Sequence, residues 1–309
     1  MVTVGLSVGG GTGPELCAVF ARAVEGKVEL LRDPVAYRTY AGVSKLAPAD
    51  AARAAAEDAA SYERFLLSLP ARGVRAVFRT AFNAQSIYLV RERLRSVKVE
   101  DLSFAGGRFL LIRDQAQGFY AGANDEASPD KIVRRCEFSR EVTERVLDFA
   151  AAEAGRRWGG AAPRRWLMAY KYHLLDTRFA GWVEDYARRH GVTIELSQPD
   201  TMNRALLGGG LTGNILIVGS NEWLDIVHAE LLARHDGGVH DERFAVNRYL
   251  DPRLADLWEY QTVHGSADDI AGKGIVNPKA TLRCAAAILE RHAGVSGAEA
   301  ALEKRLASV

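Results

Sequence analysis

Residues 264–278 read His-Gly-Ser-Ala-Asp-Asp-Ile-Ala-Gly-Lys-Gly-Ile-Val-Asn-Pro. Small residues let a ligand approach the backbone closely, and an aspartate can accept hydrogen bonds from both hydroxyls of a ribose. Asn277 and Pro278 then predict a helix start, because asparagine caps unpaired amides and proline fits the first turn. This composition suits a nucleotide-binding loop. By composition alone, a surface loop without a ligand is an equal alternative.

Outward from this stretch, short apolar runs alternate with amphipathic ones. Such alternation predicts an α/β fold with a mostly parallel sheet. The expected strands are 2–8, 28–31, 74–78, 108–112, 166–170, 192–196, 215–218 and 258–260. The expected helices are 13–24, 49–67, 82–94, 140–154, 178–189, 222–233, 280–291 and 297–306. Ser139 is expected to cap the helix that follows it.

Residues 9–15, Gly-Gly-Gly-Thr-Gly-Pro-Glu, lie between the first expected strand and the first expected helix. The spacing matches neither GxGxxG nor a P-loop, because Pro14 stands at the third glycine and no Gly-Lys-Ser/Thr follows. On this motif alone we expect a tight strand-to-helix turn. Backbone amides at such a turn can also contact an anion.

The net charge of the chain limits which kinds of binding partner we expect. The 309 residues include 40 Lys and Arg against 39 Asp and Glu, so the net charge is +1. We therefore expect no nucleic-acid partner and no membrane partner. Hydrophobic residues make up 48% and charged residues 26%, which is typical of a globular protein. Three distant cysteines and an N-terminus without a signal peptide predict a cytoplasmic location.

Four further stretches carry motifs: Ile112–Gly122 (IRDQAQGFYAG), Tyr170–Lys171 with the helix after it, Asp200–Met202, and Asn221–Ile226 (NEWLDI). Taken in order with residues 9–15 and 264–278, they resemble six motifs of the isocitrate/isopropylmalate dehydrogenase family. The family motifs usually read GDGIGPE, VRENTEGLYAG, HKANVLK, VDNM, ENLFGDI and HGSAPDIAGKGIANP. The sequence is thereby identified as a divergent member.

The resemblance implies two interleaved α/β lobes of the isopropylmalate dehydrogenase type, without a GxGxxG Rossmann motif. Residues 1–90 and 236–309 would form a large, discontinuous dinucleotide-binding lobe. Residues 91–235 would form a small lobe with the catalytic groups and much of the dimer contact. In the family, the lysine and the first metal aspartate reach across from the partner subunit, so the resemblance implies a homodimer with a shared site.

The resemblance also implies a cofactor, NAD. The residues that match the family's adenosine-binding loop are His264, Gly265, Ser266, Ala267, Asp269, Ile270 and Asn277. Asp269 matches the carboxylate that holds the ribose hydroxyls. A 2′-phosphate would be repelled there, which favours NAD over NADP.

The remaining implied roles are chemical. Tyr120 would protonate carbon as the general acid, and Lys171 would act on the substrate hydroxyl, directly or through water. Arg113 would hold a substrate carboxylate in a bidentate pair. Asp200 and Asp225 would bind Mg²⁺ or Mn²⁺, because hard cations prefer oxygen ligands.

Several positions depart from the family pattern. A gap-free match to the family's substrate helix keeps Arg95 but places Gln85 where an arginine stands and Arg79 where a serine stands. Ala229 replaces the second metal aspartate, so the metal site is expected to be weakened, remodelled or lost. His228, three residues after Asp225, is expected on the helix surface.

The resemblance implies an NAD-dependent oxidation of a malate-like 2-hydroxy acid with β-decarboxylation. The substrate is expected to be specialised, such as one of secondary metabolism, rather than isocitrate or isopropylmalate. Arg79 would contact an anionic or polar substituent of that substrate. Two alternatives stay open: a non-catalytic ligand-binding or regulatory homologue, and a dehydrogenase that does not decarboxylate.

Overall fold

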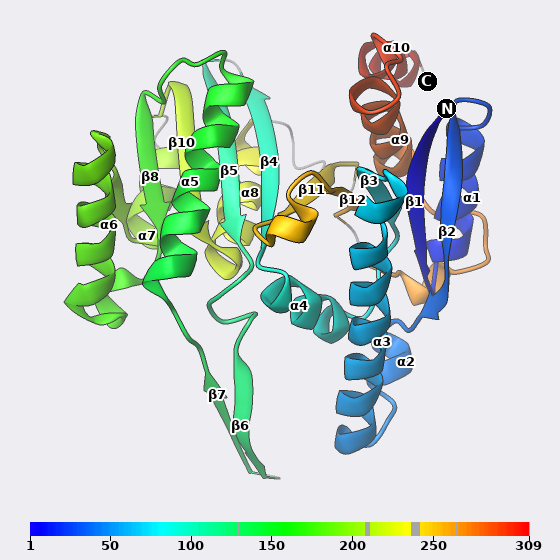
Figure 1. The fold of residues 1–309 in the computed structure, drawn as a ribbon, viewed down its shortest axis with the longest axis horizontal. Coiled ribbons are helices and arrows are strands. Elements are labelled where there is room, and N and C mark those ends of the chain that lie inside the picture. Colours follow the sequence, from blue (N-terminus) through cyan, green and yellow to red (C-terminus); the bar gives the residue numbers. More distant parts are fainter. Residues whose placement is uncertain (105, 129, 208–210, 236–241, 264, 309) are drawn as a thin grey trace. The chain divides into compact units, whose positions relative to one another are not determined.

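The computed structural model describes all residues except 105, 129, 208–210, 236–241, 264 and 309 (Figure 1). The chain divides into two compact units. Unit 1 comprises Met1–Val90 and His240–Val309, and unit 2 comprises Arg91–Val239. Each unit is described by itself.

Unit 1 is an α/β unit whose sheet has the strand order β2-β1-β3-β12-β11. Strand β1 runs parallel to β2 and β3, and β12 runs parallel to β3, whereas β11 is antiparallel to β12. Its elements are β1 (Val2–Gly9), α1 (Gly13–Ala23), β2 (Val28–Tyr37), α2 (Tyr40–Val43), α3 (Pro48–Ser68), β3 (Ala76–Arg79), β11 (Phe244–Tyr249), β12 (Trp258–Thr262), α9 (Lys279–Arg291) and α10 (Ala298–Leu306). Helix α4 (Ala84–Arg93) leads from unit 1 into unit 2.

The core of unit 1 joins the two ends of the chain. Leu6 on β1 and Phe20 on α1 are buried in one cluster with Cys284 and Ile288 on α9. Phe20 also stacks on Phe78, with ring centroids 4.2 Å apart. Because apolar burial drives folding, residues before 90 and after 240 form one cooperative core.

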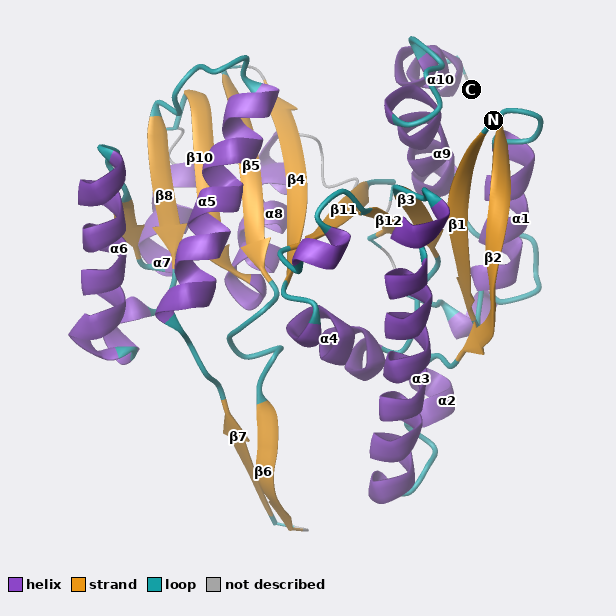
Figure 2. Cartoon of the chain, viewed as in Figure 1, coloured by secondary structure: helices purple, strands orange, loops and turns teal. Residues whose placement is uncertain are grey.

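Unit 2 has the strand order β4-β5-β10-β8-β9. Strands β5, β10, β8 and β9 are parallel, and β4 is antiparallel to β5. The elements are β4 (Ser96–Phe104), β5 (Gly107–Asp114), a hairpin of β6 (Ala123–Ser128) and β7 (Lys131–Arg135), α5 (Arg140–Arg157), β8 (Arg165–Ala169), α6 (Asp176–His190), β9 (Glu195–Ser197), α7 (Pro199–Leu207), β10 (Gly213–Ser220) and α8 (Asn221–His235). Helix α5 covers one face of this sheet and α8 the other (Figure 2).

The predicted α/β fold with a mostly parallel sheet is confirmed, and each expected helix and strand overlaps an observed one. Ser139 caps α5, since its hydroxyl accepts the Val142 amide at 3.1 Å. Strands β4, β6, β7 and β11 and helices α2 and α7 are not among the expected elements. In β4, polar residues alternate with Val97 and Val99 as in a half-buried strand, but the structure buries Lys98 and Glu100 as well.

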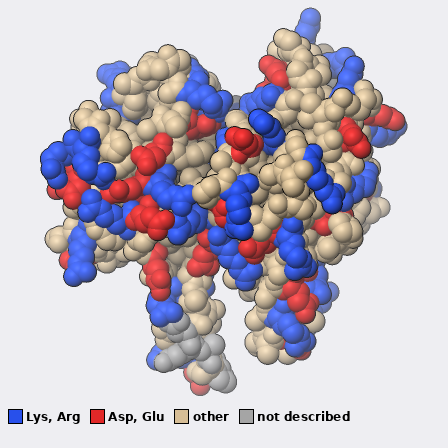
Figure 3. All heavy atoms as spheres, in the orientation of Figure 1, with Lys and Arg blue, Asp and Glu red and all other residues tan. Residues whose placement is uncertain are grey.

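The surface carries both signs of charge. On the face drawn in Figure 3, Lys and Arg side chains are interspersed with Asp and Glu. Within the described part of the chain, no helix has the length and apolar character needed to cross a membrane.

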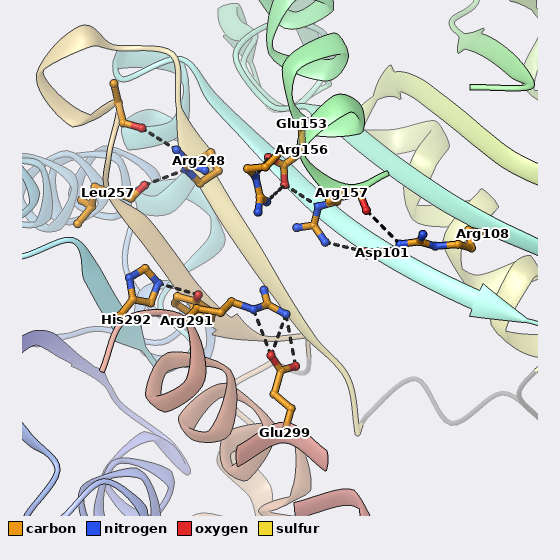
Figure 4. A network of polar contacts seen from close by, with 12 residues as sticks. Asp101, Arg108, Glu153, Arg156, Arg157, Arg248, Leu257, Arg291, His292 and Glu299 are labelled. Atoms are coloured by element: carbon orange, nitrogen blue, oxygen red, sulfur yellow. Dashed lines mark hydrogen bonds and ion pairs between the residues drawn. The ribbon is translucent and has the colours of Figure 1, made fainter. Parts of the chain in front are cut away.

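Ion pairs tie the ends of two helices. In unit 2, Glu153 of α5 accepts bonds from Arg156 and Arg157 at 2.6 Å each (Figure 4). In unit 1, Arg291 at the end of α9 pairs with Glu299 of α10 at 3.1 Å. Arginines in a last helical turn also interact favourably with the helix dipole.

Candidate functional site

The two glycine-rich stretches lie side by side in unit 1, although about 250 residues separate them. The Thr12 amide and hydroxyl both donate to the Ser266 carbonyl, at 2.9 and 3.0 Å. The Gly274 amide donates to the Glu15 carboxylate at 2.9 Å. We call residues 9–15 and 265–274 the glycine corner. It lies at the carboxyl end of β1 and the start of α1, where backbone amides point outward.

Gly11 makes this close approach possible. Its φ of +61° is left-handed, and a Cβ there would lie 2.3 Å from the Ser266 carbonyl oxygen. Any other residue would push the two stretches apart. The sequence requirement for glycine at this turn therefore comes from the neighbouring loop.

The loop itself forms a 3₁₀ turn at Asp268–Ile270. Asp268 and Asp269 are both exposed on it, and the turn follows Ala267 in a left-handed conformation with φ 44°. Helix α9 begins at Lys279 with its N-cap at Pro278, one residue later than the expected cap at Asn277, and the Asn277 side chain still accepts the Lys279 amide at 3.0 Å. His264 lies outside the described residues.

In unit 2, three predicted chemical groups follow the carboxyl ends of adjacent parallel strands. In the sheet register Gly219 of β10 pairs with Ala169 of β8 and with Arg113 of β5, so these strands end at one edge. Tyr120 follows β5, Lys171 follows β8 and Asp225 follows β10 within the first turns of α8. This edge is where ligands bind in open α/β sheets.

Asp114, the last residue of β5, links two of these loops. Its carboxylate accepts the Tyr170 hydroxyl at 3.1 Å, the Gln117 amide at 2.7 Å and the Ala116 backbone amide at 3.0 Å. Burial raises the pKa of Asp114 to about 6, against a usual 3.8, although these hydrogen bonds lower it. Asp114 is not among the site residues predicted from the sequence. Its position at the end of a strand, within the motif of residues 112–122, is the feature that could have indicated it.

This raised pKa predicts a pH-dependent stability. A buried carboxyl with a raised pKa stabilises the folded state while it is protonated. Its contribution to the free energy of unfolding is therefore complete below pH 4 and is lost as pH rises through 6. The free energy of unfolding of the wild type minus that of Asp114→Asn should fall by about 2–3 kcal/mol between pH 4 and pH 7. Urea unfolding at several pH values measures it.

Asp148→Asn is the matched control, because it removes an exposed carboxylate that accepts the Tyr186 hydroxyl at 2.8 Å. If the free energy of unfolding of the wild type minus that of Asp114→Asn stays constant or grows with pH, the raised pKa assigned to Asp114 is wrong.

Lys171 is held by an anion and an aromatic ring. Its Nζ lies 2.8 Å from Asp200 Oδ1 and 5.4 Å from the centroid of the Trp223 ring. The hydrogen bond from Lys171 lowers the pKa of Asp200. The predicted lysine and the first predicted metal aspartate are thus paired within one chain.

Arg113 lies at the centre of a buried ionic cluster. Its Nε and Nη2 donate to Glu100 at 2.7 and 2.9 Å, Nη1 donates to Asp225, and Nη2 lies 3.1 Å from His228 Nδ1. Burial raises the pKa of Glu100, but the charges of Arg113, His228 and Lys98 and the hydrogen bond from Arg113 together outweigh it and bring this pKa to about 2. The expectation that His228 lies on the helix surface is wrong, since its side chain is 2% exposed.

The other predicted substrate residues lie in different settings. Arg79 is buried in unit 1, where its Nε donates to Glu259 at 2.6 Å and its Nη2 donates to Gln261. Gln85 is exposed on α4. Arg95, in unit 2, pairs with Glu141. An anion would have to displace Glu259 to bind Arg79.

The described side chains do not fit the expected metal. Among them, no group of three or more His, Cys, Asp or Glu could hold an ion. Asp225 accepts Arg113 on one oxygen and the Asn221 amide, at 3.3 Å, on the other. Ala229 is exposed one turn further along α8 and offers no oxygen.

Comparison with solved structures gives the class of fold. The isocitrate dehydrogenase of Methylococcus capsulatus superimposes over 98% of this chain and 89% of its own, with a TM-score of 0.67 and 20% identity. The chain therefore has the fold of the isocitrate dehydrogenase class.

Sequence comparison finds similar enzymes. The family model described as isocitrate/isopropylmalate dehydrogenase matches residues 252–309. The 3-isopropylmalate dehydrogenase of Oceanobacillus iheyensis is 25% identical over 72% of this chain and 58% of its own. The isocitrate/homoisocitrate dehydrogenase of Pyrococcus horikoshii is 27% identical over 61% and 51%. The chain thus spans little more than half the length of these relatives. The chain is therefore similar to members of the isocitrate/isopropylmalate dehydrogenase family, in agreement with the resemblance of the six motifs.

Proposed function

We propose that this protein oxidises a malate-like 2-hydroxy acid with NAD and releases the β-carboxylate as CO₂. The observation that carries the proposal is the glycine corner. The contacts of Thr12 with Ser266 hold the exposed Asp269 turn beside the start of α1. The same loop lies inside the region that the family model matches, residues 252–309.

The residues of the corner fit an adenosine. Asp269 would accept the two ribose hydroxyls, and the left-handed Ala267 shapes the turn that presents it. The backbone around Gly265 would lie against the base. Bound NAD would supply the hydride acceptor.

In unit 2, Lys171 would take the proton of the substrate hydroxyl as the carbon that bears this hydroxyl gives its hydride to NAD. Asp200 keeps the ammonium charge of Lys171 in place at 2.8 Å. When the neighbouring carboxylate leaves as CO₂, its bonding electrons form an enolate. Tyr120 would then donate its proton to the carbon that lost CO₂, which completes the 2-oxo acid.

Substrate recognition would differ from that of the named relatives. Arg79 and Arg113 are both engaged by carboxylates of this chain, and Gln85 offers no charge. We therefore propose a specialised hydroxy acid with fewer anionic contacts than isocitrate. Arg95 is the proposed anion contact, because its pair with Glu141 is partly exposed and an anion can replace that carboxylate without uncovering a buried charge. Magnesium or manganese has no part in this proposal, because the side chains around Asp225 do not fit a metal. We further propose that the protein is a cytoplasmic homodimer whose two subunits share each active site.

Asp269→Asn tests the cofactor assignment. Removing this exposed carboxylate removes its repulsion of a 2′-phosphate. We expect the ratio of the NADP to the NAD dissociation constant to fall by about tenfold, the effect of about 1.4 kcal/mol. Calorimetric titration with each dinucleotide measures the ratio.

Asp268→Asn is the matched control, because it removes the neighbouring exposed carboxylate of the same turn and should leave the ratio within about twofold. Equal binding of NAD and NADP by the wild type, or equal effects of the two variants, contradicts the assignment to Asp269.

A non-catalytic dinucleotide-binding homologue is the second candidate. The internal pairing of Arg79 and Arg113 favours it, because those two arginines are withdrawn from substrate. Such a protein would bind NAD at the glycine corner and leave it oxidised with every hydroxy acid.

A further inference from the structure

We infer that the guanidinium of Arg113 takes the place of a divalent cation at Asp225, so that this chain binds neither Mg²⁺ nor Mn²⁺ there. The inference concerns the charges of unit 2 alone. It holds whether the protein is a dehydrogenase or a non-catalytic homologue.

The geometry fixes Arg113 against both carboxylates. The side chains of Arg113 and Glu100 are each 2% exposed, and two parallel hydrogen bonds of 2.7 and 2.9 Å join them. A bidentate pair of this kind is rigid. The remaining nitrogen, Nη1, is thereby aimed at Asp225 Oδ1.

Asp225 is the one partly open member of the cluster, with a side chain 45% exposed. A metal would bind here if its oxygens were available. Both are engaged, one by Arg113 and the other by the Asn221 amide. A hard cation needs several oxygen ligands, and Ala229 supplies none one helical turn away.

The charges around Asp225 also balance without a metal. The buried Lys98 lies close enough to Glu100 to lower the pKa of that carboxyl. Two carboxylates, Glu100 and Asp225, therefore face Arg113, Lys98 and the imidazole of His228, which lies 3.4 Å from Glu100, so basic groups already offset both carboxylates. A divalent ion at Asp225 would lie beside the fixed positive charge of Arg113, and the two cations would repel each other.

The direct test is a titration of the intact protein with Mn²⁺, with free Mn²⁺ followed by electron paramagnetic resonance. We expect wild type and Asp225→Asn to show the same titration, with no saturable site tighter than about 1 mM. A site tighter than this that Asp225→Asn abolishes overturns the inference.

Removing the internal cation should open the site. The double variant Glu100→Gln/Arg113→Gln removes one charge of each sign and releases Oδ1 of Asp225, while the Asn221 amide still contacts Oδ2. We expect it to bind Mn²⁺ at least about tenfold more tightly than wild type. A folded double variant that binds no better than wild type overturns the inference.

Thermal unfolding keeps the inference testable if the double variant fails to fold. Asp225→Asn should lower the melting temperature by the same amount in Mn²⁺ and in chelator, because Arg113 loses its partner in both. A melting temperature that Mn²⁺ raises in the wild type but not in Asp225→Asn contradicts the inference. Dinucleotide binding, measured on the same samples, reports separately on the proposed function.

Discussion

Lys171→Met should lower kcat for hydroxy-acid oxidation by about 10²- to 10⁴-fold, the usual contribution of a positioned acid or base. Methionine keeps the length of the side chain but cannot take a proton from the hydroxyl. NAD affinity should be unchanged, because the glycine corner belongs to unit 1. Steady-state kinetics with a calorimetric NAD titration separates the two effects.

Stability should change little in Lys171→Met. The pair with Asp200 is partly exposed, and such pairs contribute no more than about 1 kcal/mol. Lys45→Met, which removes an exposed lysine of unit 1, controls for loss of charge. If Lys171→Met retains wild-type kcat, Lys171 is a surface residue and its assigned role is wrong.

Arg79→Met should lower the free energy of unfolding by about 3–5 kcal/mol, because removing one partner of a buried ion pair leaves the other charge uncompensated. Glu259, 3% exposed, would be that charge. It also accepts the Asn247 amide at 2.9 Å. Glu259→Gln in the same chain should restore part of the loss, since glutamine removes the charge and keeps an acceptor. Denaturant unfolding measures both variants.

Arg253→Met provides the matched control in unit 1. Arg253 pairs with Asp251 at 2.6 Å, but its side chain is 62% exposed, so the expected loss is below about 1 kcal/mol. Should Arg79→Met unfold like wild type and lose only kcat/KM, Arg79 would be the substrate contact that its alignment with the family predicts.

The sequence predicts the parts of this protein that local patterns encode. Glycine, proline and capping residues mark the starts of α1, α5 and α9, and the structure places these starts at Gly13, Arg140 and Lys279. Short apolar runs locate the central parallel strands β3, β8 and β10 because those strands are largely buried on both faces. The contact of Thr12 with Ser266 follows from no local pattern. Only the family resemblance of both stretches suggests it.

The ionic cluster of unit 2 could not be predicted in this way. Glu100 lies 13 residues from Arg113, and His228 lies 115 residues from it. Lys98 and Glu100 alternate with Val97 and Val99, a pattern that predicts a strand with its polar face exposed, whereas the structure buries both charged side chains. Buried charges inside an apolar strand are costly unless paired. The pairing that makes them tolerable depends on the sheet register between β4 and β5.

Hydride transfer from the substrate to NAD is the most direct test of the proposed function. A panel of malates with varied substituents, each deuterated at the hydroxyl-bearing carbon, is incubated with the protein and NAD without added metal. Mass spectrometry then detects deuterium in the dinucleotide, and CO₂ is measured in parallel. We expect deuterated NADH and an equimolar amount of CO₂ with at least one polar-substituted malate. Binding of NAD with no deuterium transfer from any member of the panel would contradict it.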